Sequence, residues 1–182
     1  MIIDLGDFFT SQKSSFPFDL CFSPSDGADA TGMIPADMKI KEGGISLTGE
    51  IRSVGDYLSL VSTVTVRYDT FCDRCLSPFE ASLTFEFDRQ IVASQKRSAS
   101  SKIDEEEEPL AVEEGKIDIT EPLSEAVALE APTHHLCRED CPGLCPVCGK
   151  MRGDPTCKCS ETKEIDPRFE ILKKLLDNSS EV

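Results

Sequence analysis

Four cysteines near the end of the sequence have the spacing of a metal site. Cys145 and Cys148 form a C-x2-C pair, and a C-x-C pair, Cys157 and Cys159, follows after an eight-residue spacer. Four thiolates bind zinc tetrahedrally, and a C-x2-C turn brings two sulfurs to one ion. Gly149 suits such a turn, because glycine adopts positive φ without steric cost. The spacing predicts a structural zinc site whose four positions are all filled by protein.

A second C-x2-C pair, Cys72 and Cys75, lies in the middle of the chain and admits three interpretations. A redox pair normally lies at a helix N-terminus, where the dipole lowers the pKa of a thiol, but this pair falls between two predicted strands. The two cysteines could also be ordinary turn residues. We favour the third interpretation, a second zinc site that Cys137 and Cys141 complete.

The assignment of ligands has alternatives near this second set. Cys141 could serve the first site in place of Cys157 or Cys159, because its C-x3-C spacing is looser than C-x2-C. His134 and His135 precede the C-x3-C pair and could compete as ligands. We favour solvated loop positions for both histidines, since they stand next to a Pro-containing turn.

The number of cysteines and the first residues of the sequence indicate a reducing compartment. Nine cysteines is an odd number, which argues against complete pairing within one chain. The chain starts with an acidic segment that lacks the basic n-region of a signal peptide, and no apolar run reaches the length of a membrane span. We therefore predict a cytoplasmic protein with reduced thiols. Cys21, in an apolar context, is predicted to be a buried structural thiol.

The charge of the chain limits its partners. The formal net charge is −15, which counts against nucleic acid, because phosphate binding needs a basic surface. The second C-x2-C pair encloses one arginine, and the Cys-rich tail carries three further cations. These four residues are the candidate contacts to RNA or to a partner: Arg74, Lys150, Arg152 and Lys158.

The sequence contains no pattern of catalytic residues. It lacks an H-E-x-x-H helix, a phosphate-binding loop and a nucleophile elbow, and a zinc ion with four cysteine ligands has no open position for a substrate. We therefore predict a protein that is not an enzyme and that has no small-molecule substrate.

Three segments with alternating apolar residues predict strands, at 45–51, 57–68 and 79–92. An antiparallel meander of these strands would bury one face and place the second C-x2-C pair at a hairpin tip. The predicted fold class is α+β, an antiparallel β-meander with flanking helices and a C-terminal Cys-rich zinc knuckle. We expect three regions: 1–93 with the meander, an acidic flexible linker at 94–116, and 117–182 with a helix, the Cys-rich tail and a C-terminal helix.

Helix signals flank these strands. Thr120 is a predicted N-cap with Pro122 in the first turn, and a C-terminal helix is expected to start at Asp166. Leu5, with the phenylalanines that follow it, could lie on a short helix. The acidic run 104–108 predicts a mobile segment that is dispensable for folding, because like charges at this density do not bury apolar surface.

The order of these motifs is similar to that of a known family. The segment 71–80, with the sequence FCDRCLSPFE, resembles the central signature of the YceD family, the large ribosomal RNA subunit accumulation proteins. The tail 141–150, the C-x-C pair and the segment 166–169 resemble the Cys-rich form found in Gram-positive bacteria. The resemblance covers roughly residues 40–176, and it implies a non-enzymatic role in synthesis, processing or stability of large-subunit ribosomal RNA.

Two functions from different classes fit these observations. The first is a ribosome-assembly factor whose zinc knuckles dock a ribosomal protein or large-subunit RNA. The second is an acidic zinc-binding adaptor that docks a basic protein without touching RNA, which the net charge favours as the direct interaction. Neither function involves a membrane.

Overall fold

The computed structural model describes residues 1–6, 15–26, 32–55, 57–93 and 109–159. The chain forms two compact units, Met1–Cys141 and Pro142–Val182. The boundary therefore falls inside the Cys-rich region, between the two predicted sets of ligands. Within the described residues, no helix has the length and apolar character that a membrane crossing requires.

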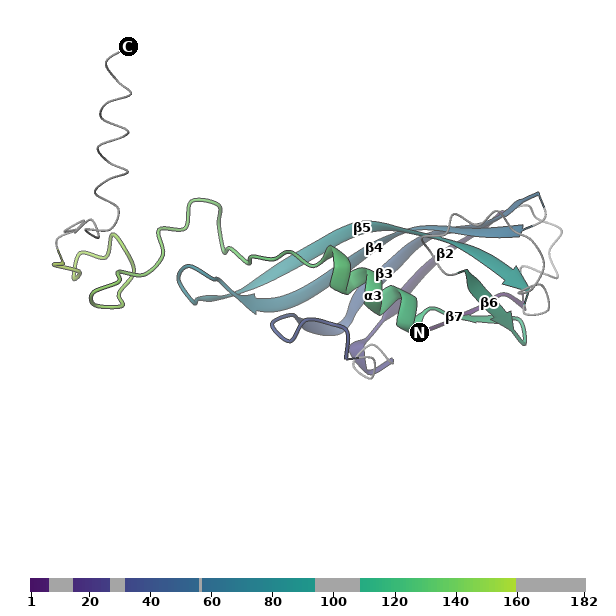
Figure 1. Cartoon of the computed structure of the whole chain (residues 1–182), viewed down its shortest axis with the longest axis horizontal. Helices are drawn as coiled ribbons and strands as arrows, with labels where there is room; N and C mark the ends of the chain where they lie inside the picture. The colour runs from purple at the N-terminus through teal and green to yellow at the C-terminus, as the bar shows by residue number, and fades with distance from the viewer. Residues whose placement is uncertain (7–14, 27–31, 56, 94–108, 160–182) are drawn as a thin grey trace, which may run out of the picture. The chain divides into compact units, whose positions relative to one another are not determined.

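Four long strands form most of the sheet in the first unit (Figure 1). They are β2 (Ser15–Phe22), β3 (Lys39–Val54), β4 (Tyr57–Phe71) and β5 (Pro78–Ala93), each antiparallel to the next. The even-numbered residues of β4 from Leu60 to Thr70 are buried, whereas the odd-numbered residues are exposed or half-buried, as the period-2 pattern predicts. The three predicted strands are therefore confirmed, and all three extend beyond their predicted ends.

Three short strands extend the sheet at its other side. They are β1 (Ile2–Asp4), β6 (Leu110–Glu113) and β7 (Lys116–Asp118), and the strand order is β1-β7-β6-β5-β4-β3-β2. β6 runs parallel to β5, while β7 pairs antiparallel with both β6 and β1. The sheet thus joins the first residues of the chain to residues more than one hundred positions later.

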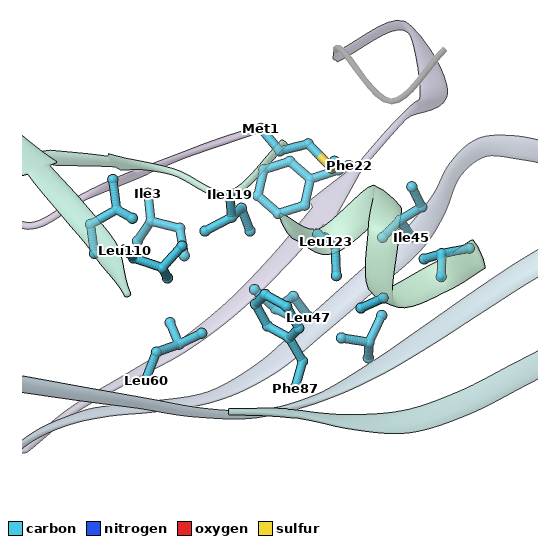
Figure 2. Close-up of a cluster of buried hydrophobic side chains, with 14 of the residues drawn as sticks. Met1, Ile3, Phe22, Ile45, Leu47, Leu60, Phe87, Leu110, Ile119 and Leu123 are labelled. Atoms are coloured by element: carbon cyan, nitrogen blue, oxygen red, sulfur yellow. The ribbon is translucent and has the colours of Figure 1, made fainter. Parts of the chain in front are cut away.

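One α-helix is described in full, α3 (Thr120–Glu130), and it lies against one face of the sheet (Figure 1). Its Leu123 and Val127 are buried. Leu123 faces the sheet residues Leu47 and Phe87, and Ile3 from β1 and Leu110 from β6 join the same cluster (Figure 2). Since the helix and the short strands cover one face, the first unit has a single hydrophobic core.

Gly49 allows β3 and β4 to approach closely. A Cβ atom at this position would lie 2.2 Å from the carbonyl oxygen of Val61 and 2.7 Å from the Cβ of Ser62. Ser62 is itself buried, and its hydroxyl donates to the carbonyl of Phe87 at 2.7 Å. Glycine is therefore required where the strands come together, because any side chain would collide with backbone.

The predicted α+β class, a meander with flanking helices, is wrong. The first unit is mainly a curled seven-stranded sheet with α3 against it. The short strands escaped prediction because three or four residues are too few to establish a period of two. The Cys-rich C-terminal region is present, although it forms a separate unit.

The range that was expected to be an acidic linker, 94–116, is described only from residue 109. There it contains β6 and the start of β7, with Leu110 buried in the core. Deleting 96–112 would therefore remove a core residue and a strand that pairs with β5.

Several other expectations concern helix ends or undescribed residues. The acidic run 104–108, the phenylalanines after Leu5 and the C-terminal helix from Asp166 lie outside the described residues. Thr120 is not an N-cap, because it is the first helical residue. Its backbone N–H instead donates to Asp118 Oδ1 at 2.8 Å.

Candidate metal centres

The C-x2-C pair Cys72 and Cys75 forms a tight loop between β4 and β5. The backbone N–H of Cys72 donates to the carbonyl of Ser77 at 3.0 Å, and the N–H of Leu76 donates back to the carbonyl of Cys72 at 2.8 Å. Leu76 has a φ of 58°, which is unusual for a residue with a side chain. The pair lies at the tip of a hairpin, as the sequence predicts.

Four sulfurs meet at this hairpin tip, and we call them the proximal cluster. Its members are Cys72, Cys75, Cys137 and Cys141, whose sulfurs all lie within 4.8 Å of one another. The sulfurs of Cys72 and Cys141 are 3.7 Å apart, as are those of Cys75 and Cys137. Tetrahedral zinc with bonds of about 2.3 Å requires sulfurs about 3.8 Å apart, whereas a disulfide requires about 2.05 Å. None of these four cysteines forms a disulfide, and the spacing of their sulfurs fits a metal ion.

Hydrogen bonds from the hairpin hold the segment that supplies two of these ligands. The backbone N–H of Asp73 donates to the carbonyl of His135 at 2.8 Å, and the N–H of His135 donates to Asp73 Oδ2 at 2.7 Å. Arg74 Nη1 donates to the carbonyls of Cys141 at 3.1 Å and Glu139 at 3.3 Å. The two residues inside the C-x2-C motif thus bind the chain on both sides of Cys137.

The expectation that both histidines are solvated is wrong for His135. Its side chain is 5% exposed, its Nε2 lies 3.1 Å from Asp37 Oδ2, and its ring meets Tyr68 edge-on at 5.6 Å. His134 is exposed as expected. Neither histidine belongs to a ligand cluster within the described residues. Burial of His135 could not be foreseen, because Asp37 and Tyr68 are distant in the sequence.

The second unit contains four further sulfurs that we call the distal cluster. They are Cys145, Cys148, Cys157 and Cys159, and they also lie within 4.8 Å of one another. The sulfurs of Cys148 and Cys157 are 3.6 Å apart. Cys141 is therefore not a member of this set, and the ligand grouping favoured from the sequence matches the two clusters.

Local backbone bonds shape the distal cluster. The N–H of Cys145 donates to the carbonyl of Lys150 at 2.7 Å, and the N–H of Gly149 donates to the carbonyl of Cys145 at 2.8 Å. Gly149 has a φ of 71°, as the knuckle prediction requires. The other half is a turn in which Asp154 Oδ1 accepts from the N–H and the hydroxyl of Thr156, each at 2.7 Å.

Backbone N–H groups favour the thiolate form of one cysteine in each C-x2-C pair. Those of Cys137, Cys75 and Arg74 lower the pKa of Cys72 to about 6 despite its burial. The N–H groups of Cys148 and Val147 likewise lower the pKa of Cys145 to about 6. Hydrogen bonding to the charged form is one of the three causes of pKa shifts, and it prepares these sulfurs as metal ligands.

The opposite shift affects at least one cysteine in each partner pair, because the pKa is raised for Cys137, Cys157 and Cys159. Burial, reinforced by the neighbouring sulfur of Cys72, raises the pKa of Cys137 to about 12. The sulfurs of Cys148 and Cys145, together with burial, raise the pKa of Cys159 to about 12. Four thiolates in such proximity repel one another, and a bound divalent cation reverses this effect by deprotonating the thiols that coordinate it. The donor set of each cluster therefore fits a cation that prefers sulfur.

The predicted cationic contacts have different environments. Arg74 is engaged with the carbonyls described above. Lys150 Nζ donates to Thr156 Oγ1 at 3.0 Å, while Arg152 and Lys158 are exposed in the second unit. Cys21, which was expected to be buried, is exposed, because it points to the face of β2 opposite the core.

Comparison with known proteins shows which family has a sequence profile that matches this chain. The sequence profile of YceD, described as large ribosomal RNA subunit accumulation protein, matches residues 60–176. Uncharacterized proteins of Mycobacterium tuberculosis strain H37Rv and of Mycobacterium bovis are each 32% identical over 138 residues, 75% of this chain. An uncharacterized protein of Mycobacterium leprae is 31% identical over 105 residues, 58% of this chain and 48% of its own length.

The matched part covers 64% of the M. tuberculosis and M. bovis proteins, so this chain spans less than two thirds of their length. No solved structure matches the chain. The profile match extends over more than half of the sequence and includes all eight cysteines of the two clusters. The chain belongs to the YceD family of large ribosomal RNA subunit accumulation proteins.

Proposed function

We propose that each cysteine cluster holds one structural zinc ion. Three observations on the described residues support a tetrahedral ion such as zinc: both donor sets consist only of sulfur, the sulfur distances of 3.6–3.7 Å suit tetrahedral coordination, and neither group includes a histidine or a carboxylate. Such an ion has no open position for water or substrate, so its role is to fix the backbone that carries the ligands.

The proposed role of the whole protein is to support the synthesis, processing or stability of large-subunit ribosomal RNA without catalysing a reaction. The observation that carries this proposal is the family match, whose range includes both clusters. The clusters would then serve as rigid docking elements, and the sheet would serve as the scaffold of the proximal cluster.

A deletion strain tests the cellular role. We expect its ratio of mature large-subunit to small-subunit ribosomal RNA to fall, and we expect the wild-type gene to restore this ratio. A gene with Cys75→Ser and Cys148→Ser should fail to restore it, because each cluster loses a ligand. Unchanged RNA ratios at every growth temperature would contradict the proposed role.

A second candidate function is supported by the net charge of −15. An acidic surface attracts basic proteins, ribosomal proteins among them, and repels RNA. In this alternative the chain is an adaptor that docks a basic protein and does not touch RNA.

Co-sedimentation with purified large-subunit RNA or with basic ribosomal proteins separates the two functions. The informative variant replaces the exposed cations of the second unit, Lys150, Arg152 and Lys158, with alanine. If RNA binds directly, this triple variant should lose RNA and keep its zinc. If the adaptor function is correct, it should bind the basic protein as the wild type does, and added salt should weaken that binding steeply.

A further inference from the structure

The two C-x2-C loops place different residues between their cysteines. In the distal cluster these residues are Pro146 and Val147, which have no side-chain hydrogen-bonding group, and Val147 is 75% exposed. In the proximal cluster they are Asp73 and Arg74, whose side chains bond to His135, Glu139 and Cys141. The distal loop forms the same turn with two uncharged residues between its cysteines, so the turn itself does not require Asp73 and Arg74.

From this contrast we infer that Asp73 and Arg74 are positioning residues that gather the proximal cluster before a metal binds. The inference rests on the proposed metal binding and names the residues that prepare it. The clasp, as we call these two residues, bonds to backbone groups of the segment 135–141, and Asp73 Oδ2 also lies 3.7 Å from Nδ1 of the exposed His134. It therefore fixes the path of the chain that carries Cys137 and Cys141.

The need for a clasp follows from the distance along the chain. Cys75 and Cys137 are separated by 62 positions, whereas the distal ligands all lie within one short segment. The core already holds β5 to β7 and α3 together, so the conformational entropy that remains to be lost is that of the segment from the end of α3 at Glu130 to Cys141. The clasp meets part of this cost without the metal, since none of its side-chain hydrogen bonds to this segment involves a sulfur.

The geometry of the clasp explains why both residues are needed. Asp73 holds His135, two residues before Cys137, through its backbone N–H and its carboxylate. Arg74 holds the carbonyl of Cys141 itself. The two contacts thus lie at the two ends of the segment 135–141. Asp37 and Tyr68 also hold His135, so loss of the Asp73 carboxylate would loosen the path to Cys137, whereas loss of the Arg74 side chain would remove both of its bonds near Cys141.

Two residues of the same segment provide matched controls. Asp140 precedes Cys141, as Arg74 precedes Cys75, and its side chain is 87% exposed. Arg138 follows Cys137 as Asp73 follows Cys72, and its Nε pairs with Asp140 at 3.5 Å. Removing either control charge changes the local electrostatics as the clasp variants do, but it breaks no side-chain bond to the hairpin.

The experiment uses the full chain with Cys145→Ser, so that bound zinc reports on the proximal cluster. Zinc affinity is measured by competition with a chromophoric chelator for Asp73→Ala, Arg74→Ala, Asp140→Ala and Arg138→Ala. We expect each clasp variant to bind zinc about 10- to 100-fold more weakly, the usual loss when a partner of a metal ligand is removed. The control variants should stay within about twofold, as expected for exposed charges.

Conservative variants separate positioning from general destabilisation. Asp73→Asn keeps an oxygen acceptor for the N–H of His135, and Arg74→Lys keeps a cationic donor for the carbonyls. Both should recover part of the lost affinity. If the alanine variants fail to fold, this graded order decides the question, because a charge effect alone would leave Asp73→Asn as weak as Asp73→Ala.

A second measurement does not require metal. The zinc-free chain is treated with a mild thiol oxidant, and the yield of the Cys75–Cys137 disulfide is measured by mass spectrometry. We expect a high yield in the wild type and in both controls, and a lower yield in the clasp variants. Equal zinc affinities or equal disulfide yields in clasp and control variants would overturn the inference. A wild-type chain without zinc would instead overturn the metal proposal, while the disulfide yields would still test the clasp.

Discussion

The proximal and distal clusters have the same knuckle and different support. In both, the N–H of the first cysteine donates to the residue five positions later, and the residue four positions later donates back to the carbonyl of that cysteine. Positive φ occurs at the equivalent residues, Leu76 and Gly149. The two C-x2-C loops of this chain therefore share one backbone conformation, although only the proximal loop connects two strands of the sheet.

The support differs because of where the other two ligands come from. The proximal knuckle continues directly into β4 and β5, and three of its four cysteines are buried. In the distal cluster only Cys145 is buried. The first unit has a hydrophobic core that includes β1 to β7 and α3, whereas the distal cluster depends mainly on local turns. On the proposed metal binding, one ion would be added to a unit that already has a core, and the other would stabilise a knuckle in which only Cys145 among the four cysteines is buried.

Metal removal should produce the largest difference between the two clusters. We expect a strong chelator to abolish amide protection in residues 142–159, since small zinc motifs fold only with their ion. Protection in β4 and β5 should persist, because a hydrophobic core stabilises them. Hydrogen exchange with and without chelator measures both regions in one sample. An equal loss of amide protection in both regions would contradict the proposed difference in how the two clusters are stabilised.

Ligand substitution sharpens the same comparison. Cys145→Ser and Cys137→Ser should each lower the zinc content from two ions to one per chain. Cys145→Ser should also unfold the distal knuckle, whereas Cys137→Ser should release only the segment around residues 135–141. Native mass spectrometry counts the ions, and limited proteolysis locates the released segment. Loss of both ions from either variant would show that the clusters depend on each other.

A substitution in the hydrophobic core of the first unit tests whether the distal cluster is independent of that unit. Leu60→Ala removes a fully buried side chain and should lower the free energy of unfolding of the first unit by about 3 kcal/mol, because it leaves a cavity. The distal cluster should keep its zinc affinity. Leu129→Ala is the control, since this leucine is 77% exposed and should change stability by less than about 0.5 kcal/mol. Urea denaturation provides both values.

The smallest effects should arise at the positive-φ positions, and they should have opposite signs. Leu76→Gly should stabilise the first unit by up to about 1 kcal/mol, because the leucine side chain is 63% exposed and its backbone is strained. Gly149→Ala should weaken the distal knuckle by about 1 kcal/mol for the same reason. Urea denaturation measures the first change and zinc competition the second. Changes of the same sign would contradict a shared backbone form.

Local patterns in the sequence predict much of this molecule. The distal cluster follows from the spacing of four cysteines and a glycine, because a knuckle is encoded within a few residues. The long strands follow from alternation over many positions. In both cases the determining contacts are close in the sequence, so the pattern itself contains the information.

The remaining features depend on distant contacts. Ile3 pairs with Ile117 across the sheet, and no feature of a three-residue segment indicates such a partner. The burial of His135 depends on Asp37 and Tyr68. The burial of Leu110 was not predicted, because the prediction for residues 94–116 used their acidic composition. Net charge over a window does not show which single residue is buried. Counting thiols grouped the four proximal cysteines, whose sulfurs lie within 4.8 Å of one another, but the bonds that Asp73 and Arg74 make to the segment 135–141 were not predicted.

The position of Cys141 in the sequence determines when the proximal cluster can form during synthesis. Every described strand of the sheet, from β1 to β7, precedes this residue, and so does α3. The ribosome adds residues one at a time from the N-terminus. An ion bound by all four proximal sulfurs would therefore be acquired late, after the complete sheet has been translated. Its presence on a newly made chain would show that the whole first unit, up to Cys141, has been translated.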